Sequence, residues 1–190
     1  RVLNLVRLYP GISRTEIAEQ IHLGKPTVSN IVGSLVGAGL VREMEPHTQI
    51  SGPGRRPVGL ELERLIRLSV GMELTGDECI GVLTDIYACP LRVVRHTFDD
   101  TTVGASLSLM ARVVDHLMEG YDPSRVLGIG VGVPGPVDPS HQDVIAAVNL
   151  GWFDVPLAPL FEEKIGRPVI VVKRQTAGAL AEYRQGVGQG

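Results

Sequence analysis

Long apolar runs and cysteine are both scarce in this 190-residue chain. No apolar stretch approaches the roughly 18 residues of a membrane-spanning helix, and the first residues lack a basic segment followed by an apolar core and a cleavage site. We therefore expect no membrane partner and a cytoplasmic location. A hydrophobic fraction of 44% and a charged fraction of 21% argue against disordered and fibrous proteins and predict one large or two small globular domains.

The two cysteines, Cys79 and Cys89, do not form a metal-ligand pattern. Zinc sites take their ligands in characteristic spacings, and the sequence contains none of them. Without a secretion signal, we interpret both residues as reduced, buried thiols in neighbouring strands. We expect neither a bound metal nor a cofactor.

The net charge of −3 is unevenly distributed along the chain. Residues 1–67 contain nine Lys and Arg against six Asp and Glu, whereas residues 68–190 contain nine against fifteen. A basic excess of this size is common on solvated surfaces. It indicates a nucleic-acid partner only together with a fold that binds one.

The first 24 residues have the pattern of two short helices. The first has an apolar face, and Pro10 ends it; the face consists of Val2, Leu3, Val6 and Leu8. The second begins with a capping box, because the Ser13 hydroxyl can accept a hydrogen bond from the Glu16 amide while the Glu16 side chain reaches back to the Ser13 amide. Ile17 and Ile21 of this helix are expected to point inward.

A third helix is predicted from Lys25 to Gly39, with Pro26 in its first turn, where a missing amide costs little. Its apolar residues recur at i, i+3, i+4 and i+7 and form a predicted buried stripe of Val28, Ile31, Val32 and Leu35. The opposite face is polar and contains no acid: it consists of Thr27, Asn30 and Ser34, flanked by Lys25 and Ser29. Two helices joined by a tight turn, the second with a polar face, predict a recognition helix for the DNA major groove.

Two strands after the third helix, at residues 40–42 and 55–62, predict a β-hairpin wing. Arg55 and Arg56 on the wing are expected to reach phosphates or a narrow minor groove, and Arg14 and Lys25 to neutralise phosphates from helix N-termini. Taken singly, each cation is more typical of a solvated surface. Together they predict an α+β winged helix-turn-helix domain over residues 1–66, with DNA contacts from Arg14, Lys25, Pro26, Thr27, Ser29, Asn30, Arg55 and Arg56.

This first domain resembles the ROK family of repressors, open reading frames and kinases. The resemblance rests on Gly24-Lys25-Pro26-Thr27-Val28-Ser29 and on Gly54-Arg55-Arg56-Pro57. Repressors of that family bind palindromic operators upstream of carbohydrate genes as dimers or tetramers. The resemblance therefore implies double-stranded operator DNA as a partner, and a homodimer or homotetramer.

Residues 67–190 predict a second domain. Three strands, at residues 68–74, 79–85 and 91–97, form an antiparallel meander, and a helix follows over residues 102–119. The apolar face of that helix consists of Leu107, Met110, Val114 and Leu117. Strands at residues 126–133, 144–148 and 169–172 then alternate with helices at residues 157–165 and 176–185, which is typical of an α/β actin-like ATPase (ribonuclease-H-like) lobe.

The second domain also resembles the ROK family, through Val133-Pro134-Gly135-Pro136-Val137-Asp138, Asn149-Leu150-Gly151-Trp152 and Ala179-Leu180-Ala181-Glu182-Tyr183. In sugar kinases of that family an early Asp-x-Gly-Gly-Thr loop holds nucleotide phosphate, and an Asn-Asp pair binds sugar, its Asp acting as general base. Here the loop reads Glu73-Leu74-Thr75-Gly76-Asp77 and the pair reads Lys173-Arg174. Asp77 repels phosphate and a guanidinium accepts no proton, so we expect no kinase activity.

Two interpretations of Lys173 and Arg174 stay open. They can bind an anionic effector such as a sugar phosphate or a sugar acid, or they form salt bridges to carboxylates of the same domain. Gly135 and Asn149 are further candidate effector-binding residues.

The leading hypothesis is a transcriptional repressor of carbohydrate uptake or catabolism genes, whose catalytically inactive kinase-like domain binds an effector or assembles the protein. A sugar kinase with a regulatory DNA-binding head is one alternative, and a protein-interaction module on a degenerate kinase scaffold is another. The second lobe of the family, with its cysteine-rich zinc motif, has no counterpart in the sequence. We therefore expect the kinase-like domain to be incomplete at its C-terminus.

Overall fold

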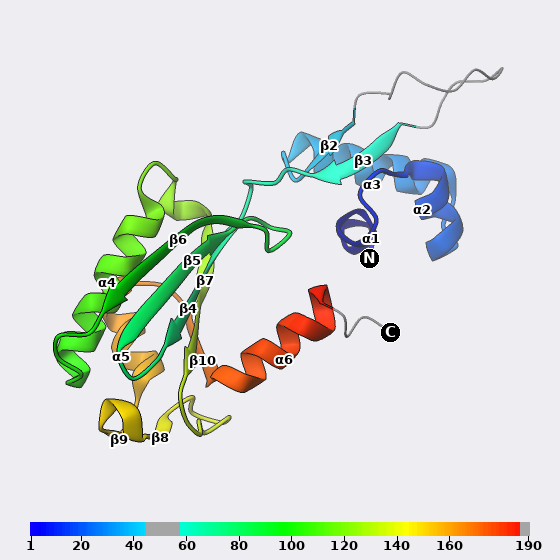
Figure 1. The fold of residues 1–190 in the computed structure, drawn as a ribbon. Helices are drawn as coiled ribbons and strands as arrows, with labels where there is room; N and C mark the ends of the chain where they lie inside the picture. Colours follow the sequence, from blue (N-terminus) through cyan, green and yellow to red (C-terminus); the bar gives the residue numbers. More distant parts are fainter. Residues whose placement is uncertain (45–57, 187–190) are drawn as a thin grey trace. The chain divides into compact units, whose positions relative to one another are not determined.

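The computed structural model describes residues 1–44 and 58–186 (Figure 1). Contacts along the chain separate it into two compact units, Arg1–Ile66 and Arg67–Gly190. Each unit has its own buried apolar residues. Among the described residues, no helix is both long and apolar enough to cross a membrane.

The first unit contains three helices and a small antiparallel sheet. Its elements are α1 (Val2–Leu8), β1 (Ile12–Ser13), α2 (Arg14–Ile21), α3 (Lys25–Gly37), β2 (Val41–Glu43) and β3 (Gly59–Leu62). β3 lies between β1 and β2, so that Ile12 pairs with Leu60 and Val41 pairs with Leu62. The sequence pattern did not predict β1, because a two-residue strand has no periodicity to detect.

The helix starts in this unit follow from local sequence. The Ser13 amide donates to the Glu16 carboxylate (2.8 Å) and the Glu16 amide donates to the Ser13 hydroxyl oxygen (3.3 Å), which confirms the capping box. Pro26 lies in the first turn of α3, as predicted. Gly39, just after α3, has a φ of +69°. This left-handed conformation ends the helix, and glycine adopts it at little energetic cost.

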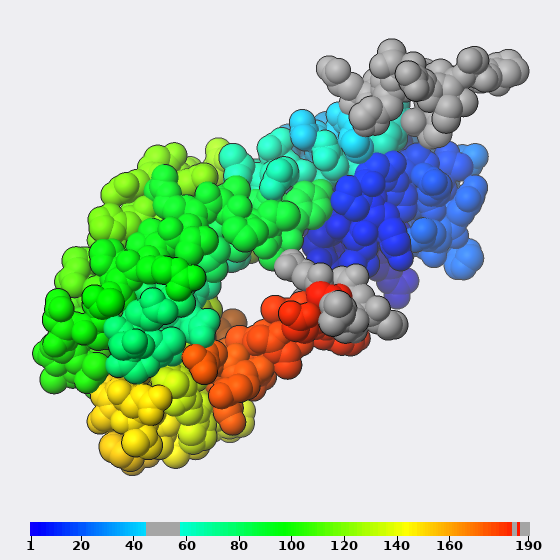
Figure 2. All heavy atoms as spheres, in the orientation of Figure 1, coloured from blue at the N-terminus to red at the C-terminus, as the bar shows by residue number. Residues whose placement is uncertain are grey.

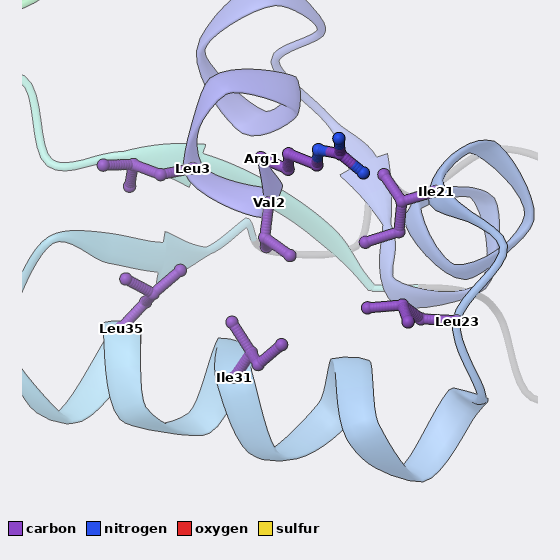
Figure 3. Close-up of a pocket in the computed structure, with 7 residues that line it drawn as sticks. All are labelled: Arg1, Val2, Leu3, Ile21, Leu23, Ile31 and Leu35. Carbon is purple, nitrogen blue, oxygen red and sulfur yellow. The ribbon is translucent and has the colours of Figure 1, made fainter.

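Two of the predicted apolar faces are only partly buried. In α1, Val2 and Val6 are buried, whereas Leu3 and Leu8 are exposed. In α3, Val28 and Val32 are fully buried, but the other two members of the predicted stripe line a pocket of about 350 Å³ and keep partial exposure (Figure 3). The pocket is lined by Arg1, Val2, Leu3, Ile21, Leu23, Ile31 and Leu35. Ile21, which was expected to point inward, is half-buried for the same reason.

The second unit is built on a five-stranded mixed sheet in the order β10-β7-β4-β5-β6. β4 (Leu68–Leu74), β5 (Glu78–Thr84) and β6 (Pro90–Thr97) form the predicted antiparallel meander, and β7 (Val126–Val133) and β10 (Val169–Lys173) run parallel to β4. β8 (Val144–Ala147) and β9 (Trp152–Val155) form a separate antiparallel pair. β9 was not predicted from the sequence.

Helices α4 (Val103–Met118) and α5 (Leu157–Ile165) bury their apolar faces against the sheet. The predicted face of α4 is buried throughout. Gly81 of β5 permits the close approach of this helix, because a Cβ atom there would overlap the Val113 side chain. Two 3₁₀ turns, Pro123–Arg125 and Val148–Leu150, complete the connections.

The last helix, α6 (Arg174–Gln185), begins two residues earlier than predicted. It contacts β7 and β10 and then extends away from the lobe (Figures 1 and 2). Leu180 and Tyr183 on its surface are exposed.

The two cysteines have different environments. Cys79 is buried, and burial raises the pKa of its thiol to about 12. Cys89 is exposed, in the turn that leads into β6, so its prediction as a buried strand residue was wrong. A turn at the end of a hairpin projects from the sheet, and this removes its side chain from the core.

Candidate functional sites

Helix α3 presents a polar surface to solvent, most of it in the N-terminal half of the helix. Every polar residue predicted for this face is exposed, and so is Pro26; the polar residues are Lys25, Thr27, Ser29, Asn30 and Ser34. Within residues 1–44 and 58–186, no side-chain hydrogen bond or ion pair engages Lys25, Thr27 or Asn30. Their donors and acceptors are therefore available to a ligand. Small hydroxyl, amide and ammonium groups of this kind match the edges of bases and the phosphates of a DNA groove.

Arg14, predicted as a phosphate contact, is already paired. It is the first residue of α2, and its Nη2 donates to Glu43 Oε1 over 2.6 Å. Both side chains keep access to solvent, with 31% of Arg14 and 48% of Glu43 exposed. Sequence inspection missed Glu43, because no local pattern relates residues that lie 29 positions apart.

The predicted wing is described only at its base. β2 and β3 are antiparallel neighbours, with Arg42 opposite Glu61 and an ion pair of 2.8 Å between them. Arg55 and Arg56 lie outside the described residues.

The arrangement of α2 and α3 determines how the first unit could contact DNA. The capping box starts α2 at Arg14 and holds the Glu16 carboxylate on backbone and hydroxyl groups of Ser13, which lowers the pKa of Glu16 below its ordinary value of 4.5. A short turn leads from α2 to α3, whose buried Val28 and Val32 leave the polar face outside. A helix pair of this kind can place its second helix in a major groove.

The second candidate site lies at the carboxyl edge of the sheet, defined as the ends of the parallel strands β4, β7 and β10. Register places Glu73 of β4 opposite Gly132 of β7, and Lys173 of β10 opposite Val133. Ligands of α/β sheets bind at the carboxyl ends of parallel strands. The edge therefore brings together the altered phosphate loop and the Lys173-Arg174 pair.

Arg174 forms an ion pair within this edge. Its Nη1 lies 3.2 Å from Oε1 of Glu73, with 42% and 44% of the two side chains exposed. One of the two interpretations of this cation, a salt bridge to a carboxylate of the same domain, thus describes what the structure contains. Lys173 is exposed, and no carboxylate of the described chain pairs with it.

The altered phosphate loop forms a tight turn that is closed by its own side chains. The Thr75 hydroxyl donates to Asp77 Oδ1 (2.8 Å) and accepts from the Glu78 amide (2.9 Å). A Cβ atom on Gly76 would lie 3.2 Å from Cβ of Asn149, so this turn and the 3₁₀ turn that contains Asn149 are neighbours. The exposed carboxylate of Asp77 lies at the tip of the loop and would repel a phosphate.

Gly135 and Asn149 lie close to this edge. A Cβ atom on Gly135 would overlap the carbonyl oxygen of Ala146 in β8, which gives this glycine a packing role. Asn149 is exposed. Among the described residues, no group of three or more potential metal ligands gathers anywhere.

The fold and these two sites define a class: a helix-turn-helix domain joined to a sugar-kinase-like domain. Two family comparisons agree with this division. Residues 1–44 match the IclR helix-turn-helix domain, and residues 71–190 match the ROK family. The chain belongs to the ROK family.

Individual relatives include regulators and kinases. A protein named "Xylose repressor" from Caldicellulosiruptor bescii is 32% identical over 177 residues, which cover 90% of this chain and 43% of that one. The crystal structure of a ROK family transcriptional regulator, a homologue of the E. coli MLC protein, shares the fold with a TM-score of 0.72 at 24% identity, over 96% of this chain and 46% of that one. A ROK family glucokinase from Streptomyces griseus gives a TM-score of 0.59 at 30% identity, over 65% and 38%. The chain thus spans less than half the length of these relatives.

Proposed function

We propose that this protein is a DNA-binding transcriptional repressor of carbohydrate uptake or catabolism genes. The observation that carries the proposal is the exposed, unpaired polar face at the N-terminal half of α3. The names of similar proteins, which include xylose repressors from Caldicellulosiruptor bescii and Bacillus subtilis, support it. A repressor must share a compartment with its DNA, so a cytoplasmic location belongs to the same proposal.

The proposed DNA contacts fall into two groups. Thr27, Ser29 and Asn30 read base edges from the polar face of α3, after a helix start fixed by Pro26. Phosphates are contacted by Arg14, Lys25 and the wing residues Arg55 and Arg56. Phosphate contacts position the protein but do not read sequence, so operator choice rests on the first group.

A repressor of this design works as a symmetric assembly. Two helix-turn-helix units that read one palindrome must span half-sites about 34–36 Å apart, which requires a homodimer or a homotetramer. The proposed boundary between the DNA-binding domain and the kinase-like domain falls between residues 66 and 67, where the chain divides into two compact units.

The proposed effector site is the carboxyl edge of the second unit, with Gly135, Asn149, Lys173 and Arg174. A sugar or sugar phosphate bound there would favour one arrangement of the assembly over another and so change its affinity for DNA. Lys173 has no carboxylate partner among the described residues, and Arg174 can join it on an anionic group by exchanging its contact with Glu73. If no small molecule binds, the kinase-like domain serves assembly alone.

A sugar kinase is the second candidate, favoured by the likeness to the Streptomyces griseus glucokinase. We propose that the protein is not an enzyme. The position of the family's general base is occupied by Arg174, which cannot accept a proton, and Asp77 disfavours nucleotide phosphate at the loop. Sugar-dependent ATP consumption by the purified full chain would support the kinase instead.

Fluorescence anisotropy of the full chain on DNA from upstream of its own gene tests the repressor. The complex is titrated with neutral sugars and then with sugar phosphates at fixed salt. Release by a sugar phosphate that is lost in Lys173→Ala, but kept when the exposed Lys164 of α5 is changed in Lys164→Ala, supports an anionic effector at the carboxyl edge. Binding that no sugar disturbs supports the assembly role, and failure to bind this DNA more tightly than random DNA contradicts the repressor.

A further inference from the structure

The cations predicted to contact phosphate near the starts of α2 and α3 have different environments. Lys25 is exposed and has no acidic partner among residues 1–44 and 58–186. Arg14 has one: Glu43, the last residue of β2, at 2.6 Å. Among the described residues of the proposed DNA-binding unit, the Lys25 ammonium is therefore free, whereas the Arg14 guanidinium is neutralised by Glu43.

In the ion pair between Arg14 and Glu43, another anion can replace Glu43. Ion pairs between partly exposed side chains contribute only about 0–1 kcal/mol, because water competes with both partners. A DNA phosphate can therefore replace Glu43 as the partner of Arg14. Until it does, the carboxylate neutralises the cation and itself repels phosphates nearby.

We infer that Glu43 acts as an internal competitor that weakens the contact between Arg14 and DNA phosphate. This inference rests on the proposed DNA-binding function and adds a residue that limits affinity. Because phosphate contacts carry no sequence information, Glu43 weakens binding to operator and random DNA by the same factor. Glu43 therefore lowers the affinity for DNA of any sequence, so that the protein dissociates from DNA more readily. Operator choice still depends on the polar face of α3.

Glu43→Gln tests the inference, because glutamine keeps the shape of the side chain and removes its charge. Binding of the full chain to a random-sequence duplex is measured by anisotropy between about 50 and 200 mM salt. We expect affinity at low salt to rise about twofold to fivefold, and the slope of log K against log salt to steepen by about 0.9, the value for one added phosphate contact.

A double-mutant cycle separates competition for Arg14 from a general loss of negative charge. In the Arg14→Ala background, Glu43→Gln should leave the salt slope unchanged. Glu61→Gln is the matched control, since it removes one acid from the neighbouring strand, where Glu61 pairs with Arg42 and not with Arg14. Circular dichroism of each variant verifies that the fold is kept.

The outcomes separate the two proposals. Operator-specific binding by the wild-type protein decides the repressor function. The competitor role of Glu43 is wrong if the wild type binds DNA but Glu43→Gln binds it no more tightly, or if this change raises the affinity equally with and without Arg14. Neither result contradicts the repressor function. If the wild type binds no DNA at all, both the repressor function and the competitor role of Glu43 are wrong.

Discussion

Arg174 at the start of α6 holds Glu73 of β4 through an Nη1–Oε1 contact of 3.2 Å. The resemblance to the family predicts that these two residues occupy the positions at which its sugar kinases bind nucleotide phosphate and deprotonate sugar. In this chain they bind each other. The carboxyl edge therefore contains an ion pair between two residues of the same domain.

This ion pair should contribute little to stability. Both side chains are more than 40% exposed, so we expect Arg174→Ala and Glu73→Gln each to lower the free energy of unfolding by less than about 1 kcal/mol. Urea denaturation of the full chain measures it, and the double variant should lose no more than the larger single one. A loss above about 2 kcal/mol would show that the pair is desolvated.

Asn30 and Lys25 should differ in the kind of DNA binding that they support. Asn30→Ala should cost about 1–3 kcal/mol on the operator and almost nothing on random DNA, because its amide can read one base pair. Lys25→Ala, the matched control on the same helix, should weaken both equally and reduce the salt slope by about 1. Competition anisotropy with the two DNAs gives both values. Equal losses for Asn30→Ala on both duplexes would contradict its assigned role.

The capping box should stabilise α2 in a pH-dependent manner. Ser13→Ala removes the cap and should lower the free energy of unfolding of the first unit by about 1 kcal/mol. The pKa of Glu16 is lowered in the folded chain by its bonds to Ser13. The unfolded chain therefore binds the proton first as pH falls, so the stabilisation is complete above the ordinary pKa of 4.5 and is lost through the lower, folded value.

Chemical denaturation between neutral and acidic pH checks this. The difference in stability between wild type and Ser13→Ala should narrow as the solution becomes acidic. A difference that stays constant with pH would mean that the Glu16 carboxylate plays no part in the cap.

The two cysteines should react at very different rates. Cys89 is exposed, whereas Cys79 is buried and its pKa is raised to about 12, which leaves almost no thiolate at neutral pH. We expect a thiol reagent to label the native full chain at Cys89 only, and Cys89→Ser to remove the labelling. Unfolding in urea should expose both sites, and rapid labelling of the native Cys89→Ser variant would show that the lobe opens around β5.

Local sequence determined much of this protein. Periodicity and capping residues predicted the three N-terminal helices, the meander, and the bounds of α5 and β7, because their signals lie within one or two helical turns or one strand. Polar residues at fixed spacing likewise predicted the exposed face of α3. Short elements such as β1 and β9 were not predicted, because they are stabilised by pairing with neighbouring strands and have no sequence pattern of their own.

Only the tertiary structure decided which charges meet. Arg14 and Glu43 are separated by 29 positions and Glu73 and Arg174 by 101, and each pair is joined by the folding of strands and helices next to one another. The sequence alone supplied the family motifs and the prediction that Arg174 replaces the catalytic carboxylate. It could not tell a cation that is free to bind a ligand from one already neutralised, because the partner of a charge depends on strand register and helix placement across the whole unit.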